Sequence, residues 1–549
     1  MERLSAVVVV PARDEERWIA GCMAALAGQT VACGSFEIVL VADACSDGTV
    51  AAARAAADAL SLALDVIPGP GTGSGGARRA GMDAAAERLL SAGRPNGLLA
   101  TTDADTRPAP DWLARQLIHL GNGALVVAGL VELDSAELHG AVRRRRESDA
   151  AVRLADVRAL DPAAAHHHFA GASLGMTAAA YRQVGGLEPT AALEDEAFAE
   201  RLQAHAIPIL RASDVRVRTS VRTDGRARRG LSVDLAVSAW AERRRYRAQA
   251  FTTEALRAVK SRPISVVIPT KECGSTIAGV VRETVGPLRA AGLVDELVVV
   301  DAGSGDGTAS AAREAGARVL SQDELLPEFG PALGKGDAMW RALHASTGEL
   351  VCFLDGDTAD PDPAHLRGLL GPLLTDPSVQ LVKGAFERPL LRAGALMPDE
   401  GGRVTELMAR PLLNFHQPRL AGFAQPLAGE FAGRRELFEA LPFPVGYGVE
   451  IAVLLDALEL VGLDALAECH LGRRQNRHQP LRALGEMAYA VLAAVERRIG
   501  GQAGHGASAD ATPRSPARGH YVRPWDDLAV ARVPIAERPP LASLRREVA

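Results

Sequence analysis

The stretch Val351-Cys-Phe-Leu-Asp-Gly-Asp-Thr358 places two carboxylates, one residue apart, directly after a short apolar run. An apolar run of this kind predicts a buried strand, and Asp355 and Asp357 would lie at its carboxyl end. Two carboxylates in that position suit Mg2+ or Mn2+, which can bridge the oxygens of a nucleoside diphosphate. By itself, the pattern also fits an ordinary turn after a strand.

The same signature occurs twice in the chain. Its parts are Ala6 to Pro11, Phe36 to Asp43 and Asp103-Ala104-Asp105 in the first half, and Ser265 to Pro269, Glu296 to Asp301 and Asp355-Gly356-Asp357 in the second. A repeat of so long a period indicates duplicated domains. Short β-branched runs alternate with helical segments in both halves, which predicts an α/β fold with ligands at the carboxyl ends of the strands.

The 549 residues divide into four predicted parts. We expect a first domain over 1–221, a basic helical linker over 222–260, a second domain over 261–499 and a largely flexible tail over 500–549. The tail prediction rests on the abundance of Gly, Ala, Ser and Pro after residue 500, a composition that buries too little apolar surface to order itself.

Composition favours a small-molecule partner. With 48% hydrophobic and 23% charged residues, the chain is typical of soluble globular proteins. A net charge of −6 gives no general reason to expect nucleic acid or an anionic membrane. No segment approaches the roughly 18 apolar residues of a membrane span. The six scattered cysteines read as small hydrophobes in a reducing compartment, so we expect a cytoplasmic protein without an integral membrane segment.

Three further segments of the second half could hold anions or nucleotides. Asp301 precedes a glycine-rich turn, where its side chain could contact a base or ribose. Lys335 lies between two glycines at a predicted helix start, which suits phosphate, although an exposed lysine in a turn fits as well. The stretch Gly402-Arg-Val-Thr405 offers amides, a guanidinium and a hydroxyl to a small anion such as a carboxylate or phosphate.

These segments together resemble the glucosyl-3-phosphoglycerate synthases. The matching stretches are Pro269, Asp301 to Ser304, Pro331 to Trp340, Asp355 to Asp357, Gly402 to Leu407, Gln425 to Glu430, Gly446 to Ile451 and Asn476 to Leu481. The resemblance covers about residues 261–491. It implies a retaining hexosyltransferase that makes glucosyl-3-phosphoglycerate from a nucleotide-activated glucose, UDP-glucose or GDP-glucose, and 3-phosphoglycerate. It also implies a homodimer, and for the chain as a whole two tandem GT-A (nucleotide-diphospho-sugar transferase, Rossmann-like) domains.

The resemblance also implies roles for individual residues. For the donor and nucleotide these are Asp301, Lys335, Asp355 and Tyr447, with Glu272 as the nearest candidate for a further nucleotide contact. For the phosphoglycerate acceptor they are Gly402, Arg403, Thr405, Arg474 and Asn476.

The metal would be bound by Asp357 and by a histidine. Family members often have that histidine where this chain has Asn476, and His478 lies two residues further on. We expect His478 to be the ligand. Glu450 is expected to position the reactants rather than to act as a nucleophile, because the family is usually assigned same-face attack in which the leaving diphosphate takes the proton.

The first half resembles the large inverting A-type (family 2-like) glycosyltransferases. The resemblance implies that Asp43 and Asp103 contact the donor, that Asp105 binds the metal and that Asp195 is the catalytic base. Alternatively, the acidic residues around Asp195 only charge the first turn of a helix, where the helix dipole favours them. The acceptor of this half is not predicted.

Two alternatives to this reading stay open. A sugar-nucleotide nucleotidyltransferase also uses paired acids and a Gly-Lys-Gly segment, but it would release pyrophosphate rather than a nucleoside diphosphate. The first domain could instead be an inactive scaffold that stabilises or regulates the second.

Overall fold

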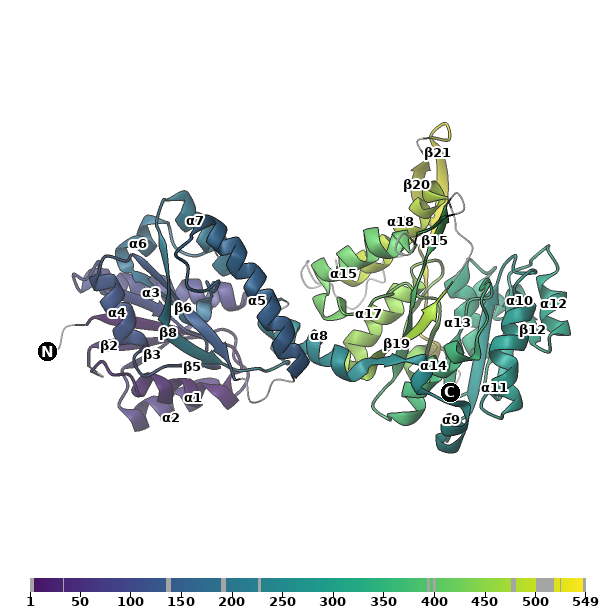
Figure 1. Cartoon of the computed structure of the whole chain (residues 1–549), viewed down its shortest axis with the longest axis horizontal. Coiled ribbons are helices and arrows are strands. Elements are labelled where there is room, and N and C mark those ends of the chain that lie inside the picture. Colours follow the sequence, from purple (N-terminus) through teal and green to yellow (C-terminus); the bar gives the residue numbers. More distant parts are fainter. Residues whose placement is uncertain are drawn as a thin grey trace. The chain divides into compact units, whose positions relative to one another are not determined.

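The computed structural model describes residues 4–32, 34–134, 140–188, 194–225, 229–392, 395–397, 401–474, 480–499, 518–523 and 525–546. The chain divides into two compact units, Met1–Ala239 and Trp240–Ala549 (Figure 1). Each unit has its own sheet and its own hydrophobic clusters on the two faces of that sheet.

The first unit is built on one mixed sheet. In the described residues its strand order is β3-β2-β1-β4-β7-β6-β8-β5. The strands are β1 (Ala6–Ala12), β2 (Phe36–Ala42), β3 (Leu64–Pro68), β4 (Leu98–Thr101), β5 (Thr106–Pro108), β6 (Val126–Leu133), β7 (Leu174–Thr177) and β8 (Ile209–Thr219). Strands β1 to β4 pair in parallel, whereas β7 runs antiparallel to β4 and β6.

Apolar side chains on both faces of the strands explain why helices cover both sides of this sheet. In β1, Val8 and Val10 belong to one cluster, and Val7 and Val9 to the other. The first cluster is covered by α1 (Glu16–Ala27), α2 (Thr49–Leu60) and α4 (Trp112–Gly121). The second is covered by α3 (Ser74–Ser91), α6 (Ala178–Gln183) and α7 (Glu194–Ala204). Helix α5 (Gly140–Leu160) follows β6.

The second unit repeats this architecture. Its described strands are in the order β12-β11-β10-β13-β17-β14-β19-β9. They are β9 (Arg245–Arg247), β10 (Ile264–Thr270), β11 (Glu296–Asp301), β12 (Arg318–Ser321), β13 (Leu350–Phe353), β14 (Leu381–Glu387), β17 (Phe431–Arg434) and β19 (Leu466–Arg473). The pairing directions match those of the first sheet except at the edge, where β9 is parallel to β19 but β5 is antiparallel to β8. The predicted tandem α/β fold is confirmed.

Helices again cover both faces of the second sheet. One face carries α9 (Thr253–Val259), a continuous helical stretch over 277–290, α12 (Thr308–Glu314) and α14 (Pro363–Thr375). The other carries α13 (Lys335–Ala345), α15 (Arg410–His416), α16 (Arg435–Ala440), α17 (Val449–Val461) and α18 (Leu484–Ile499). Among the described residues of both units, no helix combines the length and the apolar character needed to cross a bilayer.

The segment expected as a linker over 222–260 is divided between the two units. Helix α8 (Leu231–Arg244) and α9 are helical as expected, but β9 adds an edge strand to the second sheet. The indole of Trp240 is fully buried and donates a hydrogen bond of 2.7 Å to the carbonyl of Leu466. The unit boundary therefore falls at Ala239, some way before the expected residue 260, because this tryptophan packs into the second core.

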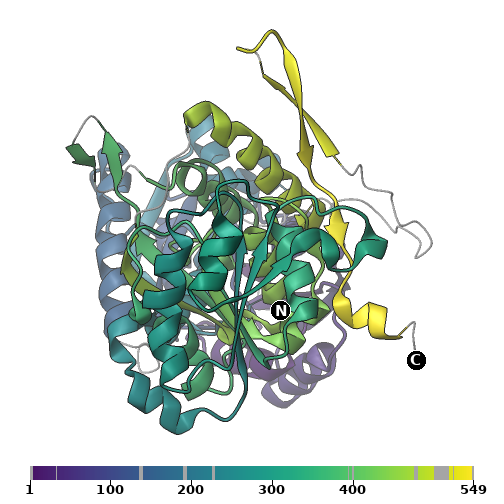
Figure 2. The ribbon, with the colours of Figure 1, turned by 90° about the vertical axis from the view of Figure 1, so that its right-hand side faces the viewer.

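The prediction of a largely flexible tail is wrong for the residues after 517 that the structure describes. Strands β20 (Arg518–Arg523) and β21 (Ala529–Pro534) form a hairpin, which Figure 2 shows in yellow. Strand β22 (Glu537–Arg538) then pairs with β18 (Phe443–Pro444), and Leu541 of α19 (Leu541–Arg546) is buried in the second core. Composition misses this order because partners far away in sequence supply it.

Candidate functional site

A cation held by two carboxylates lies at the centre of the second unit. The ammonium of Lys335, the first residue of α13, lies 2.7 Å from Oδ1 of Asp355 and 2.9 Å from Oε1 of Glu450. Asp355 directly follows β13, and Glu450 lies in the first turn of α17. Three residues predicted separately from the sequence are thus brought together from two helix starts and one strand end.

Glycines let the backbone approach this cluster closely. A Cβ on Gly336 would lie 1.9 Å from the carbonyl oxygen of Pro444, so only glycine fits beside Lys335 at the start of α13. A Cβ on Gly429 would lie 2.3 Å from Oδ1 of Asp355 and 2.4 Å from Nζ of Lys335. The loop before β17 therefore forms one wall of the site.

Lys335 and Asp355 are both ionised in the neutral range. Burial lowers the pKa of Lys335, but the carboxylates of Asp355 and Glu450 outweigh it and leave that pKa well above its usual value. Burial raises the pKa of Asp355, but Lys335, with Arg388 and Arg474 as further cations, brings it below its usual value. A site of this kind keeps its charges fixed while a charged ligand binds.

A buried polar network lies around Arg474. Its guanidinium is paired with the carboxylate of Glu430 and lies 2.5 Å from Nδ1 of His365. Arg474 is only 3% exposed and Glu430 is fully buried. Burial, followed by the charge of Arg474, lowers the pKa of His365 to about 4. Arg474, which is expected to contact the acceptor, is thus also bound by Glu430 and His365.

Sequence reasoning missed Lys383, which is also fully buried. Its ammonium donates a hydrogen bond of 2.6 Å to the carbonyl of Ala428 and lies 4.6 Å from the ring centroid of Phe431. Burial lowers the pKa of Lys383 to about 8. The sequence feature that could have indicated a functional lysine is its position inside the otherwise apolar run of β14. Glu430, which pairs with Arg474, ends the matching stretch Gln425 to Glu430, but the resemblance implies no role for it.

Asp301 and Glu272, both predicted to contact the nucleotide, bind the same turn after β11. The carboxylate of Asp301 accepts hydrogen bonds from the amide and hydroxyl of Ser304, at 3.0 and 2.6 Å. Oε1 of Glu272 accepts one of 2.9 Å from the amide of Gly305. Glu272 has a φ of 55°, an uncommon value for this residue type. The turn after β11 is therefore fixed from both sides.

Three residues expected at the acceptor, Gly402, Arg403 and Thr405, lie at the start of the helical turn that precedes α15. Gly402 has a φ of 67°, and its carbonyl accepts a hydrogen bond of 3.0 Å from the amide of Glu406. Arg403 is half-buried, and Thr405 is buried at the start of the helical turn that precedes α15. Tyr447 is 45% exposed. Asn476 and His478 lie outside the described residues.

The donor set at the end of β13 suits a hard divalent cation. Asp357 is half-buried two residues after Asp355, and both supply the carboxylate oxygens that Mg2+ and Mn2+ prefer. Their negative charge contributes to raising the pKa of Cys273 to about 11, after burial as the main cause. In the part of the chain that the structure describes, no three His, Cys, Asp or Glu side chains gather as metal ligands, and the expected histidine ligand, His478, lies outside that part.

In the first unit, Asp43 and Asp103 are bonded within the protein. The carboxylate of Asp43 accepts hydrogen bonds of 2.6 and 3.0 Å from the amides of Gly71 and Gly73. Asp103 forms an ion pair of 2.7 Å with Arg78 of α3. The ion pair of Arg78 with Asp103 therefore corresponds to that of Lys335 with Asp355. In each unit the cation lies on the helix before the strand that precedes Asp-x-Asp, and it pairs with the first of the two carboxylates.

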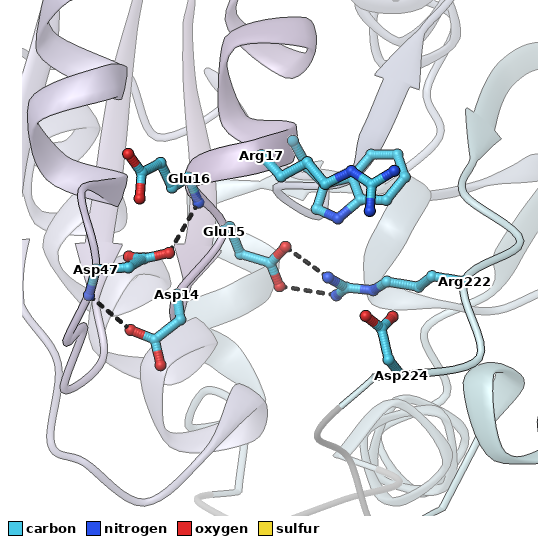
Figure 3. Close-up of a pocket in the computed structure, with 8 residues that line it drawn as sticks. Asp14, Glu15, Glu16, Arg17, Asp47, Arg222 and Asp224 are labelled. Atoms are coloured by element: carbon cyan, nitrogen blue, oxygen red, sulfur yellow. Dashed lines mark hydrogen bonds and ion pairs between the residues drawn. The ribbon is translucent and has the colours of Figure 1, made fainter. Parts of the chain in front are cut away.

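A pocket of about 460 Å³ in the first unit is lined by Asp14, Glu15, Glu16, Arg17, Trp18, Asp47, Arg222 and Asp224 (Figure 3). Arg222 donates hydrogen bonds of 2.6 and 2.7 Å to the two oxygens of Glu15. Its Nε lies 3.0 Å from Oδ2 of Asp105, the predicted metal ligand. Burial raises the pKa of Asp105, and Arg222 offsets part of that rise. Asp195 lies half-buried in the first turn of α7.

Comparison with known proteins agrees with this architecture. The family model described as Glycosyl transferase family 2 matches residues 7–177 and 265–395. The glucosyl-3-phosphoglycerate synthase of Mycolicibacterium smegmatis is 44% identical over 299 residues, which are 54% of this chain and 94% of that protein.

Solved structures are similar over the same extent of chain. The mannosyl-3-phosphoglycerate synthase of Rubrobacter xylanophilus is 41% identical with a TM-score of 0.50, and the match covers 56% of this chain and 98% of that one. The Mycobacterium tuberculosis glucosyl-3-phosphoglycerate synthase, crystallised with Mn2+, UDP-glucose and phosphoglyceric acid, is 40% identical with a TM-score of 0.47 over 54% and 96% of the two chains.

The chain is a glycosyltransferase: it belongs to glycosyl transferase family 2, which both of its units match, and over 54% of its length it is a homologue of the glucosyl-3-phosphoglycerate synthases.

Proposed function

We propose that the second unit transfers glucose from a nucleoside diphosphate glucose to 3-phosphoglycerate, with retention of configuration. The observation that carries this proposal is the 44% identity to a glucosyl-3-phosphoglycerate synthase, of which the chain covers 94%. The stretches that resemble those synthases all lie in the second unit, and three of their residues form the Lys335, Asp355 and Glu450 cluster.

The donor would bind across the carboxyl ends of β11 and β13. The turn held by Asp301 and Glu272 would take the nucleotide, since ligands of open α/β sheets bind at this edge. Lys335, a cation throughout the neutral range, would face the diphosphate. Asp355, an anion in the same range, would accept hydrogen bonds from sugar hydroxyls, and Tyr447 would line the sugar site.

Asp357 and His478 would hold Mg2+ or Mn2+. A cation bound there would neutralise the diphosphate as it leaves. The acceptor would lie against Gly402, Arg403 and Thr405, whose amide, guanidinium and hydroxyl match the phosphate and carboxylate of phosphoglycerate. The further acceptor residues expected from the sequence, Arg474 and Asn476, remain part of this proposal.

In the transfer step, the bond between the anomeric carbon and the diphosphate oxygen breaks, and a bond to the acceptor hydroxyl oxygen forms on the same face. The hydroxyl proton passes to the departing diphosphate. Glu450 keeps Lys335 in place and forms no bond to the sugar. Mass spectrometry of Glu450→Ala and of the parent protein with donor alone tests this: a glycosyl adduct on the parent that Glu450→Ala lacks would contradict the step.

The decisive assay mixes the full-length protein with 3-phosphoglycerate, Mg2+ and one donor at a time. UDP-glucose, GDP-glucose and GDP-mannose are compared, because the relatives include both glucosyl and mannosyl transferases. We expect glucosyl-3-phosphoglycerate and a nucleoside diphosphate, and Asp357→Ala should abolish the product. No hexosyl phosphoglycerate with any donor would refute the proposal, and pyrophosphate release from a nucleoside triphosphate would indicate the nucleotidyltransferase alternative.

For the first unit, the match over residues 7–177 supports a shared fold. That it is a second, inverting transferase with Asp195 as its base stays a prediction, as does the predicted homodimer. Asp105→Ala is a matched control for Asp357→Ala in the assay above, and the hexosyl phosphoglycerate activity should survive it.

A further inference from the structure

The loop after β8 of the first unit corresponds in the sheet order to the segment after β19 of the second. Strands β8 and β19 hold the same place in the two sheets, next to β6 and β14 respectively. After β19 the sequence contains His478, the expected metal ligand. After β8 it contains Arg222. The segment expected to supply a metal ligand in the second unit thus corresponds to one that contains a cation, Arg222, in the first.

Arg222 is held by carboxylates on several sides. Its two terminal nitrogens bond both oxygens of Glu15, and its Nε lies 3.0 Å from Asp105. The charge of Asp224 adds to those of Glu15 and Asp105 in holding the pKa of Arg222 above its usual value, against the effect of burial. Figure 3 shows the side chains of Glu15 and Asp224 directed toward the guanidinium.

Both carboxylates of the first Asp-x-Asp sequence have cationic partners. Asp103 pairs with Arg78 at 2.7 Å, and Asp105 with Arg222. Oδ2 of Asp105 also accepts a hydrogen bond of 2.7 Å from the hydroxyl of Ser220. A divalent ion at Asp105 would meet the guanidinium of Arg222 at close range, and like charges in a half-buried site repel strongly. The described residues around Asp105 therefore do not fit the predicted metal.

We propose that the guanidinium of Arg222 takes the place of the divalent cation in the first unit, so that this unit binds no Mg2+ or Mn2+ at Asp105. The family architecture is then retained there without metal-assisted transfer. This inference concerns residues of the first unit alone and does not depend on the activity proposed for the second.

The test is the number of Mn2+ ions bound per full-length chain, measured by electron paramagnetic resonance with saturating UDP. We expect one ion in the parent protein and one in Asp105→Ala, but none in Asp357→Ala. An ion that persists in Asp357→Ala and is lost in Asp105→Ala combined with Asp357→Ala would overturn the proposal. No ion in the parent protein would contradict the metal site of the second unit and leave the first unit metal-free, as proposed.

A gain of binding tests the role of Arg222 directly. In an Asp357→Ala background, Arg222→Ala frees Glu15 and Asp105, and we expect Mn2+ to bind where none bound before. Arg17→Ala is the matched control: Arg17 lines the same pocket and is exposed, with its guanidinium 5.1 Å from the ring centroid of Trp18. If Arg222→Ala retains its circular dichroism spectrum and thermal transition yet gains no ion, Arg222 does not occupy a cation site. Equal gain in Arg17→Ala would also refute the proposal.

Discussion

The ammonium nitrogen of Lys335 lies 2.7 Å from Oδ1 of Asp355, although these residues come from a helix start and a strand end. We expect Lys335→Met to leave two carboxylates without their cation. Loss of the pair should cost about 2 kcal/mol of unfolding free energy and lower kcat/KM at least about 100-fold. Urea unfolding and steady-state kinetics with the full-length protein measure the two effects.

The matched control for that variant is Lys260→Met. Lys260 pairs with the half-exposed Asp295 at 2.7 Å, and exposed ion pairs contribute about 0–1 kcal/mol. Its kinetics should equal those of the parent protein. Equal loss of activity in both variants would mean that the Lys335 cluster has no special part in catalysis.

Gly429→Ala should disturb the same cluster without changing its charge. The new methyl group would lie 2.3 Å from Oδ1 of Asp355, so the carboxylate or the loop must move. We expect kcat/KM to fall at least about tenfold, because small displacements in a preorganised site are costly. Gly121→Ala, at the end of α4 with no atom within 4 Å of its new Cβ, should behave as the parent protein. Unchanged kinetics in Gly429→Ala would show that the cluster tolerates displacement.

Lys383 should impose a pH dependence on stability. Its pKa is about 8 in the folded protein, whereas in the unfolded chain it is near 10.5. Between these values the unfolded state binds more protons, so the contribution of this lysine to stability rises with pH. The penalty of burying the charged lysine, about 3 kcal/mol, is fully present below pH 8 and is relieved as the pH approaches 10.5.

Lys383→Met removes that titrating group at similar volume. We expect the unfolding free energy of the parent protein minus that of Lys383→Met to become more favourable to the parent between pH 8 and pH 10.5. Urea unfolding at several pH values gives this difference, in which the titration of groups common to both proteins cancels. A difference that stays flat over this range would mean that Lys383 is charged, or neutral, in both states throughout.

The last residues of the chain should stabilise the start of α13. Arg538 donates two hydrogen bonds, of 2.9 and 2.6 Å, to the fully buried carboxylate of Asp337, which also pairs with Arg341. Arg538→Ala should cost about 2 kcal/mol, since it removes two hydrogen bonds to a buried carboxylate that still pairs with Arg341. It should also lower activity, because Asp337 lies two residues after Lys335.

Arg518→Ala, an exposed position of the β20–β21 hairpin, serves as the control and should change unfolding free energy by less than about 0.5 kcal/mol. Thermal and urea unfolding measure the loss of unfolding free energy in each of the two variants. If Arg538→Ala and Arg518→Ala are equally stable, the contact between β22 and α13 contributes nothing.

Local pattern was enough to predict the α/β fold and three parallel strands of each large sheet. Apolar runs that end in aspartate identified β2, β4, β11 and β13, and the glycines around Lys335 identified the start of α13. These features are visible because each depends on neighbours in sequence. The resemblance also placed Lys335, Asp355 and Glu450 in one site, and the structure brings their side chains into contact.

The features that pattern missed depend on distant partners. Trp240 belongs to the second unit because its indole donates a hydrogen bond to the carbonyl of Leu466 and packs against the ring of Phe423. Arg538-Pro539 reads as a mobile stretch, yet Arg538 pairs with Asp337 and the carbonyl of Pro539 accepts a hydrogen bond of 2.9 Å from Trp340. The ion pair of Arg222 with Glu15 likewise joins residues 207 positions apart in the sequence, so no local pattern predicts it.

The contact of β22 with the second core sets an order for the assembly of the protein during translation. The first unit is a continuous stretch that ends at Ala239, so its sheet can close while the rest of the chain is still being made. The second unit needs residues 537–541 to cover the start of α13. It therefore completes its core only after residues 537–541 have left the ribosome, and a nonsense mutation shortly before residue 537 would release a finished first unit joined to an unfinished second one.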